Sequence, residues 1–212
     1  MTDSQTQNRV VLVHGLWYRS TGMRPLAARL RRRGYHSTLF DYSSVYGHAA
    51  EHARDLYALA RDHQHGPLHW VGHSMGGLVI LRMLAEYSDL PPGRVVLLGS
   101  PVAGSGVARR LAGRWWSHWL VGASAELLGR GVRAPRSHAV GVIAGNRNLG
   151  VGRVLGGVSG HGDGTVSVSE TRLEGASDHI VLPVTHTGMV FSASVAAQTD
   201  SFLQTGEFKH QD

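Results

Sequence analysis

The chain has 212 residues, of which 42% are hydrophobic, so it is long enough to bury one good core and too short for two ordinary domains. It contains no cysteine, which excludes disulfides, thiolate metal ligands and a cysteine nucleophile. The formal net charge of +6 raises the question of an acidic polymer as partner, but no aromatic residues are interleaved with the arginines and no nucleic-acid motif is present, so we expect no nucleic-acid binding.

The ends of the chain are polar. We expect residues 1–8 to form an N-terminal tail, 9–206 to form a single domain and 207–212 to form a C-terminal tail. The N-terminus lacks the pattern of a signal peptide, and no stretch reaches 18 apolar residues, so a cytoplasmic location is expected.

Short apolar runs alternate with helical patterns from the N-terminus to the C-terminus. The expected strands are 9–15, 36–42, 68–74, 94–100, 138–145 and 178–185, and the expected helices are one ending at Gly34 and those at 48–63, 75–87 and about 188–204. Because parallel neighbours in a sheet need a crossover connection, this alternation predicts an α/β fold with a mostly parallel sheet of about six strands and helices on both faces.

The sequence "WVGHSMGG" contains the pattern G-x-S-x-G, made by Gly72, Ser74 and Gly76. Ser74 falls where the buried strand 68–74 passes into the helix 75–87, which is the position of a nucleophilic serine on a sharp strand-to-helix turn. The alternative is a tight turn whose serine only caps the next helix. We interpret Ser74 as a catalytic nucleophile.

A serine nucleophile needs a histidine base, and in this type of fold the histidine comes late in the chain. His186 follows the last expected strand at its carboxyl end, whereas His179 lies at the amino end of that strand. About 23 Å of extended chain separates them at roughly 3.3 Å per residue, so only one of the two can reach Ser74. We choose His186, and we consider His161, in a Gly-rich loop, a weaker competitor.

The acid that orients the histidine is selected in the same way. Asp163 lies in the loop after strand 138–145, at the carboxyl side of the sheet, whereas Asp178 precedes the last strand, and Asp41 and Asp55 come before the serine. About 18 residues separate Asp163 from the strand end, which is a long connection. The alternative role for Asp163 is an Asx-type turn.

The oxyanion of an acyl-transfer intermediate needs two N–H donors placed in advance. Met75, which follows the nucleophile, is expected to give one, and Leu16, in the loop after the first strand, the other. Trp17 and Tyr18 are expected to line the acyl pocket. His14 is interpreted as a packed residue under this loop.

Four segments in this order, "VLVHGLW", "VGHSMGGLV", "GDGTVSV" and "VTHTGM", resemble the α/β-hydrolase superfamily, and more narrowly its small bacterial esterases and lipases related to the GPI inositol-deacylase-like group. The resemblance implies a triad of Ser74, Asp163 and His186 with an oxyanion hole from Leu16 and Met75, and no metal and no cofactor. The chain departs from the larger lipases of this superfamily, because only about 37 residues, 101–137, separate two expected strands. We therefore expect a minimal fold with no large cap domain.

Residues 101–137 contain Trp115, Trp116 and Trp119 at helical spacing, and we leave two interpretations open: a small lid that presents aromatics to an acyl chain or a lipid surface, or ordinary crossover helices. The sequence thus predicts a serine hydrolase for a small-molecule ester or lipid, with transient contact with a lipid surface. The alternatives are a thioesterase, an amidase, an acyltransferase or a non-catalytic ligand-binding protein. The oligomeric state is left open.

Overall fold

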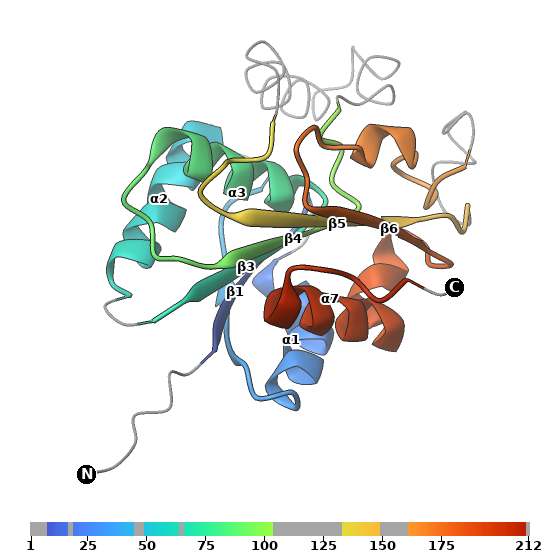
Figure 1. Cartoon of the computed structure of the whole chain (residues 1–212), viewed down its shortest axis with the longest axis horizontal. Coiled ribbons are helices and arrows are strands. Elements are labelled where there is room, and N and C mark those ends of the chain that lie inside the picture. The colour runs from blue at the N-terminus through green and yellow to red at the C-terminus, as the bar shows by residue number, and fades with distance from the viewer. Residues whose placement is uncertain are drawn as a thin grey trace.

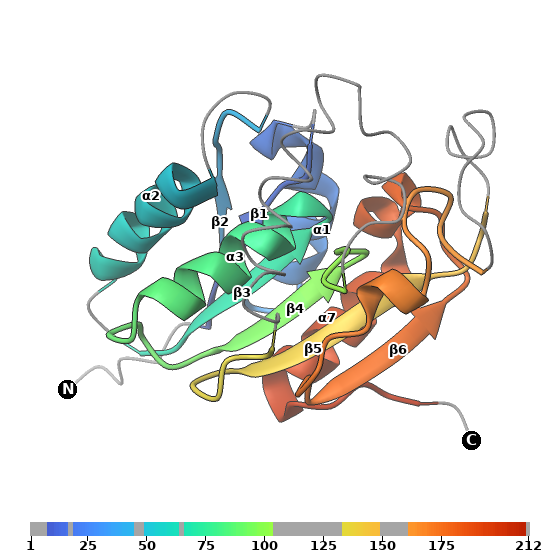
Figure 2. The same cartoon turned by 90° about the horizontal axis from the view of Figure 1, so that it is seen from above.

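The centre of the molecule is one parallel sheet with the strand order β2-β1-β3-β4-β5-β6, which Figure 2 shows from above. The computed structural model describes residues 8–16, 19–44, 49–63, 66–103, 133–148 and 161–210. The strands are β1 (Arg9–Val13), β2 (His36–Phe40), β3 (Leu68–His73), β4 (Arg94–Leu98), β5 (Ala139–Gly145) and β6 (Asp178–Leu182). All neighbouring pairs run parallel, so the predicted fold class is confirmed.

Helices cover both faces of this sheet, as Figure 1 shows with the sheet seen near its edge. One face carries α2 (Ala49–Arg61) and α3 (Met75–Glu86), and the other carries α1 (Arg24–Arg31) and α7 (Ala193–Thr205). Three short 3₁₀ segments complete the described elements: η1 (Ser20–Met23), η2 (Ser169–Thr171) and η3 (Thr187–Phe191).

Two hydrophobic cores lie on opposite sides of the sheet because successive side chains of each strand point to opposite faces. In β1, Val11 and Val13 join the core under α2 and α3, while Val10 and Leu12 join the core under α1 and α7. A strand that is buried on both faces must be apolar throughout. This explains why β1 reads as a continuous run of Val and Leu after Arg9 in the sequence.

The helix α3 lies unusually close to the strands beside it, and glycines make this approach possible. A Cβ on Gly72 would lie 2.5 Å from the backbone of Gly77, and a Cβ on Gly76 would overlap the carbonyl oxygen of Val13. Only glycine fits at these two positions without moving backbone atoms. The G-x-S-x-G pattern therefore has a packing cause that is independent of any chemistry at Ser74.

The C-terminal part differs from the predicted element boundaries. The last strand ends at Leu182 instead of at residue 185, because Pro183 follows and cannot donate a hydrogen bond to a neighbouring strand. The closing helix is divided into η3 and α7 at Ser192, whose hydroxyl accepts from the N–H of Val195 at 3.3 Å and caps α7. His186 consequently lies in the turn that leads into η3.

Within the expected C-terminal tail, Phe208 is buried against Phe202, with the two ring centroids 4.9 Å apart. Residues 104–132, with the three tryptophans of the lid or crossover interpretations, lie outside the described residues. Among the helices that the structure describes, none combines the length and the apolarity needed to cross a bilayer.

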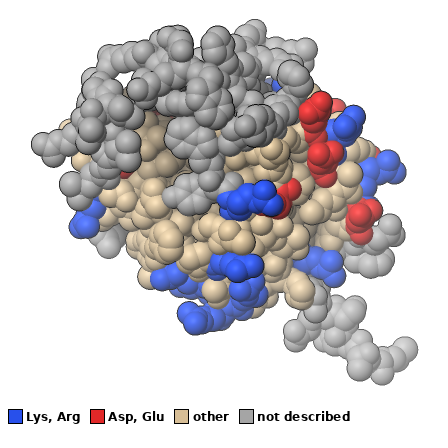
Figure 3. All heavy atoms as spheres, turned by 180° about the vertical axis from the view of Figure 1, so that it is seen from behind, with Lys and Arg blue, Asp and Glu red and all other residues tan. Residues whose placement is uncertain are grey.

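The basic residues of α1 lie on its solvent side. Leu26, Ala27 and Leu30 are fully buried, whereas Arg24 and Arg31 are exposed. In Figure 3 the Lys and Arg side chains gather toward the lower part of the view, which is the side of the sheet that α1 and α7 cover in Figure 1. This division is that of an ordinary amphipathic surface helix, as the sequence predicts.

Candidate active site

Ser74 stands on the turn between β3 and α3 in a conformation that side chains rarely adopt. Its backbone has φ 55° and ψ −121°, and among the residues that the structure describes it is the one non-glycine residue with a positive φ. Such backbone strain costs on the order of 1–3 kcal/mol and persists only where the surroundings enforce it. Here the Ser74 N–H donates to the carbonyl of Leu98 at 2.8 Å, which ties the turn to β4.

Asp163 and His186 form a hydrogen-bonded pair. The Nδ1 of His186 lies 2.7 Å from Oδ2 of Asp163, and the backbone N–H of His186 donates to the carbonyl of Asp163 at 2.9 Å. The second carboxylate oxygen, Oδ1, accepts from the backbone N–H groups of Thr165 and Val166 at 2.9 and 2.8 Å. Because a carboxylate only accepts, Nδ1 of His186 carries the hydrogen, and Nε2 of the neutral ring is left as an acceptor.

Asp163 thus makes the contacts of both interpretations that the sequence left open, the Asx-type turn and the pairing with His186. Its side chain is 1% exposed and makes an Asx-type turn through Oδ1, and the same carboxylate holds His186 through Oδ2. The side chain of His186 keeps 12% of its surface accessible. A buried carboxylate is therefore hydrogen-bonded to a histidine that remains partly exposed.

Two glycines make room for this pair. Gly99, directly after β4, has φ +57°, and a Cβ there would lie 2.9 Å from Oδ2 of Asp163 and 3.1 Å from Nδ1 of His186. A Cβ on Gly145, at the end of β5, would lie 2.8 Å from Cβ of Asp163. Asp163 and His186 therefore pack directly against the carboxyl ends of β4 and β5.

The pair lies beside the serine turn. His73, which immediately precedes Ser74, has its Nε2 3.0 Å from the carbonyl oxygen of His186, and the two imidazole centroids are 4.7 Å apart. Gly15, in the loop after β1, also packs closely against this serine turn, because a Cβ on it would lie 2.9 Å from Cβ of Ser74. The structure thus brings Ser74, Asp163 and His186 to one edge of the sheet, at the carboxyl ends of its strands.

The loop after β1 holds Leu16, one of the two expected oxyanion donors. Leu16 is partly buried against the core under α2 and α3, and Met75, the other expected donor, is the fully buried first residue of α3. The first N–H groups of a helix have no carbonyl partner within it, so they suit an anion. Trp17 and Tyr18 lie outside the described residues.

His14 anchors this loop from below, as the sequence predicts. Its ring is fully buried and stacks on Tyr42 with centroids 4.4 Å apart, and its Nδ1 lies 2.9 Å from the carbonyl oxygen of Gly15. The hydroxyl of Tyr42 donates to the carbonyl of His14 at 2.8 Å. Burial is the main cause that lowers the pKa of His14, so this histidine is neutral under the loop.

The rejected candidates lie elsewhere. His179 is the second residue of β6, and its Nε2 lies 2.9 Å from the hydroxyl of Thr171, whereas His161 is exposed. Asp178 accepts from the backbone N–H of Phe208 at 2.7 Å and from His210 at 2.9 Å, at the amino edge of the sheet. Asp41 and Asp55 instead pair with the arginines Arg19 and Arg54.

No group of three or more side chains of the kinds that bind metals is found in the part of the chain that the structure describes. The catalytic arrangement inferred from the sequence uses no metal and no cofactor. Its chemistry would be carried by the serine, the histidine and the acid alone.

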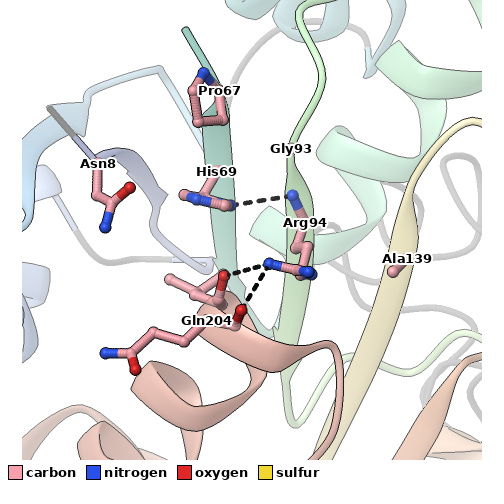
Figure 4. Close-up of a pocket in the computed structure, with 8 residues that line it drawn as sticks. Asn8, Pro67, His69, Gly93, Arg94, Ala139 and Gln204 are labelled. Atoms are coloured by element: carbon pink, nitrogen blue, oxygen red, sulfur yellow. Dashed lines mark hydrogen bonds between the residues drawn. The ribbon is translucent and has the colours of Figure 1, made fainter. Parts of the chain in front are cut away.

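A pocket of about 600 Å³ lies at the opposite, amino edge of the sheet (Figure 4). On its wall, the Nη1 of Arg94 donates to the carbonyl oxygens of Leu203 and Gln204 at 2.8 and 3.1 Å, and the Arg94 N–H donates to Nδ1 of His69 at 3.0 Å. Burial, followed by the charge of Arg94, lowers the pKa of His69 to about 4. Arg94 thus satisfies the last carbonyls of α7. Because this pocket is lined by neither Ser74 nor the pair of Asp163 and His186, we place the candidate active site at the carboxyl edge of the sheet.

A parallel, doubly covered sheet with a serine on its strained strand-to-helix turn is the architecture of the α/β hydrolases. A family model described as "Alpha/beta hydrolase family" matches residues 10–185, so the chain belongs to the alpha/beta hydrolase family. Among curated proteins, none matches the chain by sequence.

Solved structures with the same fold include several esterases and lipases at low identity. A lipase of Bacillus licheniformis in its propeptide form is 21% identical with a TM-score of 0.75, over 100% of this chain and 53% of that one. A metagenomic carboxyl esterase is 18% identical with a TM-score of 0.71, over 86% of this chain and 65% of that one. An esterase of Pyrococcus furiosus is 20% identical with a TM-score of 0.61, over 95% of this chain and 83% of that one.

The chain therefore spans 53% of the length of this lipase and 65% of the length of this carboxyl esterase. At such identities the likeness concerns the fold. The chain thus has the fold of a hydrolase family to which it belongs.

Proposed function

We propose that the protein is a serine hydrolase that cleaves carboxylic esters through an acyl-enzyme on Ser74. The observation that carries the proposal is the 2.7 Å contact between Nδ1 of His186 and Oδ2 of Asp163, at the edge where Ser74 holds a φ of 55°. This contact fixes the tautomer in which Nε2 of His186 can take a proton. The esterases and lipases among the structural neighbours agree with it.

In the proposed acylation step, Nε2 of His186 takes the hydroxyl proton while Oγ of Ser74 forms a bond to the ester carbonyl carbon. The carbonyl oxygen becomes an anion, which accepts from the backbone N–H groups of Met75 and Leu16. The intermediate collapses, the bond to the alcohol oxygen breaks, and His186 gives its proton to the leaving alcohol. Asp163 stabilises the imidazolium throughout.

In deacylation, His186 takes a proton from water, and the resulting hydroxide attacks the acyl carbon. The acid leaves and Oγ of Ser74 recovers its proton from His186, so the enzyme returns to its starting state. The same atoms serve a thioester, an amide, or transfer of the acyl group to another alcohol in place of water. A non-catalytic binding protein with this fold is the alternative from another class.

For the substrate, we propose a small-molecule ester or lipid with a short to medium acyl chain. The proposal rests on the short connection between β4 and β5, about 37 residues over 101–137, which is too short for a large cap. A phospholipase of Legionella pneumophila has the same fold at 16% identity with a TM-score of 0.68, over 90% of this chain and 55% of that one. A transient contact with lipid surfaces and a kinship with the GPI inositol-deacylase-like group belong to this proposal.

The test is a panel of p-nitrophenyl esters from acetate to palmitate, with the wild-type chain and with Ser74→Ala. We expect turnover that is highest on short to medium chains and lost in Ser74→Ala. A folded wild-type chain that hydrolyses no ester, thioester or amide would favour the binding protein. A maximum at palmitate with activation at a lipid interface would refute the chain-length proposal alone.

A further inference from the structure

His73 occupies a position that links the serine turn to the histidine loop. It is the last residue of β3, directly before Ser74, and only 1% of its surface is exposed. Its Nε2 lies 3.0 Å from the backbone carbonyl oxygen of His186, 113 positions later in the chain. Nothing in the proposed chemistry uses this side chain, although it contacts the residue that would act as the base.

The contact requires one particular form of the ring. A carbonyl oxygen only accepts hydrogen bonds, so Nε2 of His73 must carry a hydrogen and donate it. Burial, and after it the nearby His186, lowers the pKa of His73 to about 3, so the ring is neutral at ordinary pH. The other titratable groups that face it are Asp163 and His14. A neutral donor adds no second positive charge beside His186 when that residue becomes an imidazolium.

The three bonds to His186 hold it from two sides. Asp163 accepts from the ring Nδ1 at 2.7 Å, which orients the imidazole, and from the backbone N–H of His186 at 2.9 Å, which fixes its backbone. The bond from His73 acts on the opposite end of the same residue, its carbonyl group. His73 and Ser74 are consecutive residues. The bond from His73 therefore links the backbone of His186 to the strand-to-helix turn that carries Ser74.

We propose that His73 is a positioning residue that donates its Nε2–H to the carbonyl of His186 and so holds this histidine in register with Ser74. The inference rests on the proposed function of Ser74 and His186. Reacting atoms must be held within a few tenths of an ångström of a productive geometry, and a misplacement of about 1 Å can cost about 10²-fold in rate. Loss of the bond should therefore lower kcat and leave KM nearly unchanged.

The test compares two replacements of His73. His73→Gln places an amide N–H close to the position of Nε2, whereas His73→Phe keeps a ring of similar size without a donor. We expect His73→Phe to lose about 10- to 10²-fold in kcat on a p-nitrophenyl ester with KM within about twofold, and His73→Gln to recover most of that loss. The rate of Ser74 labelling by a fluorophosphonate should follow the same order.

His69→Phe is the matched control, because His69 is a second buried histidine on β3, at the other edge of the sheet. It should lose stability and keep the kcat of the folded protein. If His73→Phe does not fold, His73→Asn replaces it, since its amide is too short to reach His186. The Gln variant should then exceed the Asn variant in kcat.

The outcomes separate the two proposals. If the wild-type chain labels but the Phe and Gln variants label and turn over at equal rates, His73 is a packing residue and the positioning role is wrong. The same conclusion follows if His73→Phe has a higher kcat or a higher labelling rate than His73→Gln. If the folded wild-type chain neither labels nor turns over any ester, the proposed function fails and the positioning role fails with it.

Discussion

The substitution Asp163→Asn removes one charge and changes almost no volume, so it probes the role of the acid with little disturbance of the fold. In the structure, Oδ1 of Asp163 accepts two backbone hydrogen bonds, from Thr165 and Val166. The amide oxygen of an asparagine must keep this place, because an NH₂ group there would face two N–H donors. Its NH₂ group is therefore directed at Nδ1 of His186.

The consequence is a change of tautomer. An NH₂ group donates, so Nδ1 of His186 must become an acceptor and the hydrogen must move to Nε2. A ring with its hydrogen on Nε2 cannot take the proton of Ser74, and the imidazolium loses its counter-charge. Together these losses should lower kcat by about 10³ to 10⁴, or about 4 to 5.4 kcal/mol in activation free energy.

The assay is steady-state hydrolysis of a p-nitrophenyl ester, with thermal unfolding to confirm the folded state. The matched control is Asp178→Asn, because Asp178 also accepts from a histidine, His210, and from a backbone N–H, that of Phe208, but at the amino edge. Asp178→Asn should keep kcat within about twofold of the wild-type value. If Asp178→Asn abolishes turnover while folded Asp163→Asn retains it, the assignments of both the acid and His186 are wrong.

Three further changes test other parts of the account. Gly99→Ala, at a φ of +57° and with its Cβ 2.9 Å from Oδ2 of Asp163, should separate the acid from His186 and lower kcat by about 10²-fold; full activity would contradict the close packing. Arg94→Met frees the last carbonyls of α7, so chemical denaturation should give a free energy of unfolding lower by about 1–3 kcal/mol while kcat stays constant. The third change is in pH: the pKa of His69 is lowered to about 4 and that of His73 to about 3, so below about 6.5 the unfolded chain takes up protons that the folded chain does not. Urea unfolding should therefore show stability falling as the pH drops from about 6.5 toward 4, and a constant stability over that interval would mean that these rings are not buried in neutral form.

The sequence predicts this sheet well because β1, β3 and β4 are buried on both faces and are therefore mostly apolar, with few polar residues such as the two histidines of β3. The placement of Ser74, Asp163 and His186 follows from the order of strands, since carboxyl ends of parallel strands meet at one edge. Asp163 and Asp178 flank opposite ends of strands, and the structure accordingly places Asp163 beside His186 and Asp178 beside His210.

Other features have no local signal. The contact between His73 and His186 joins residues 113 positions apart, and neither periodicity nor composition indicates it. A Cβ on Gly99 would lie too close to Asp163, which arrives from a distant loop. Phe208 is buried by α7 although the surrounding residues are polar. In each case the cause is tertiary packing, which a window of sequence does not contain.

The proposed chemistry depends on Ser74 as a nucleophile that His186 activates. The most direct measurement is mass spectrometry of the intact folded protein after exposure to a fluorophosphonate, followed by mapping of the modified peptide. We predict one covalent adduct per chain on Ser74, absent in Ser74→Ala and slowed by orders of magnitude in His186→Ala. Two results would contradict this role of Ser74. One is a folded wild-type chain that forms no adduct, and the other is an adduct on another residue that also forms in the Ser74→Ala variant.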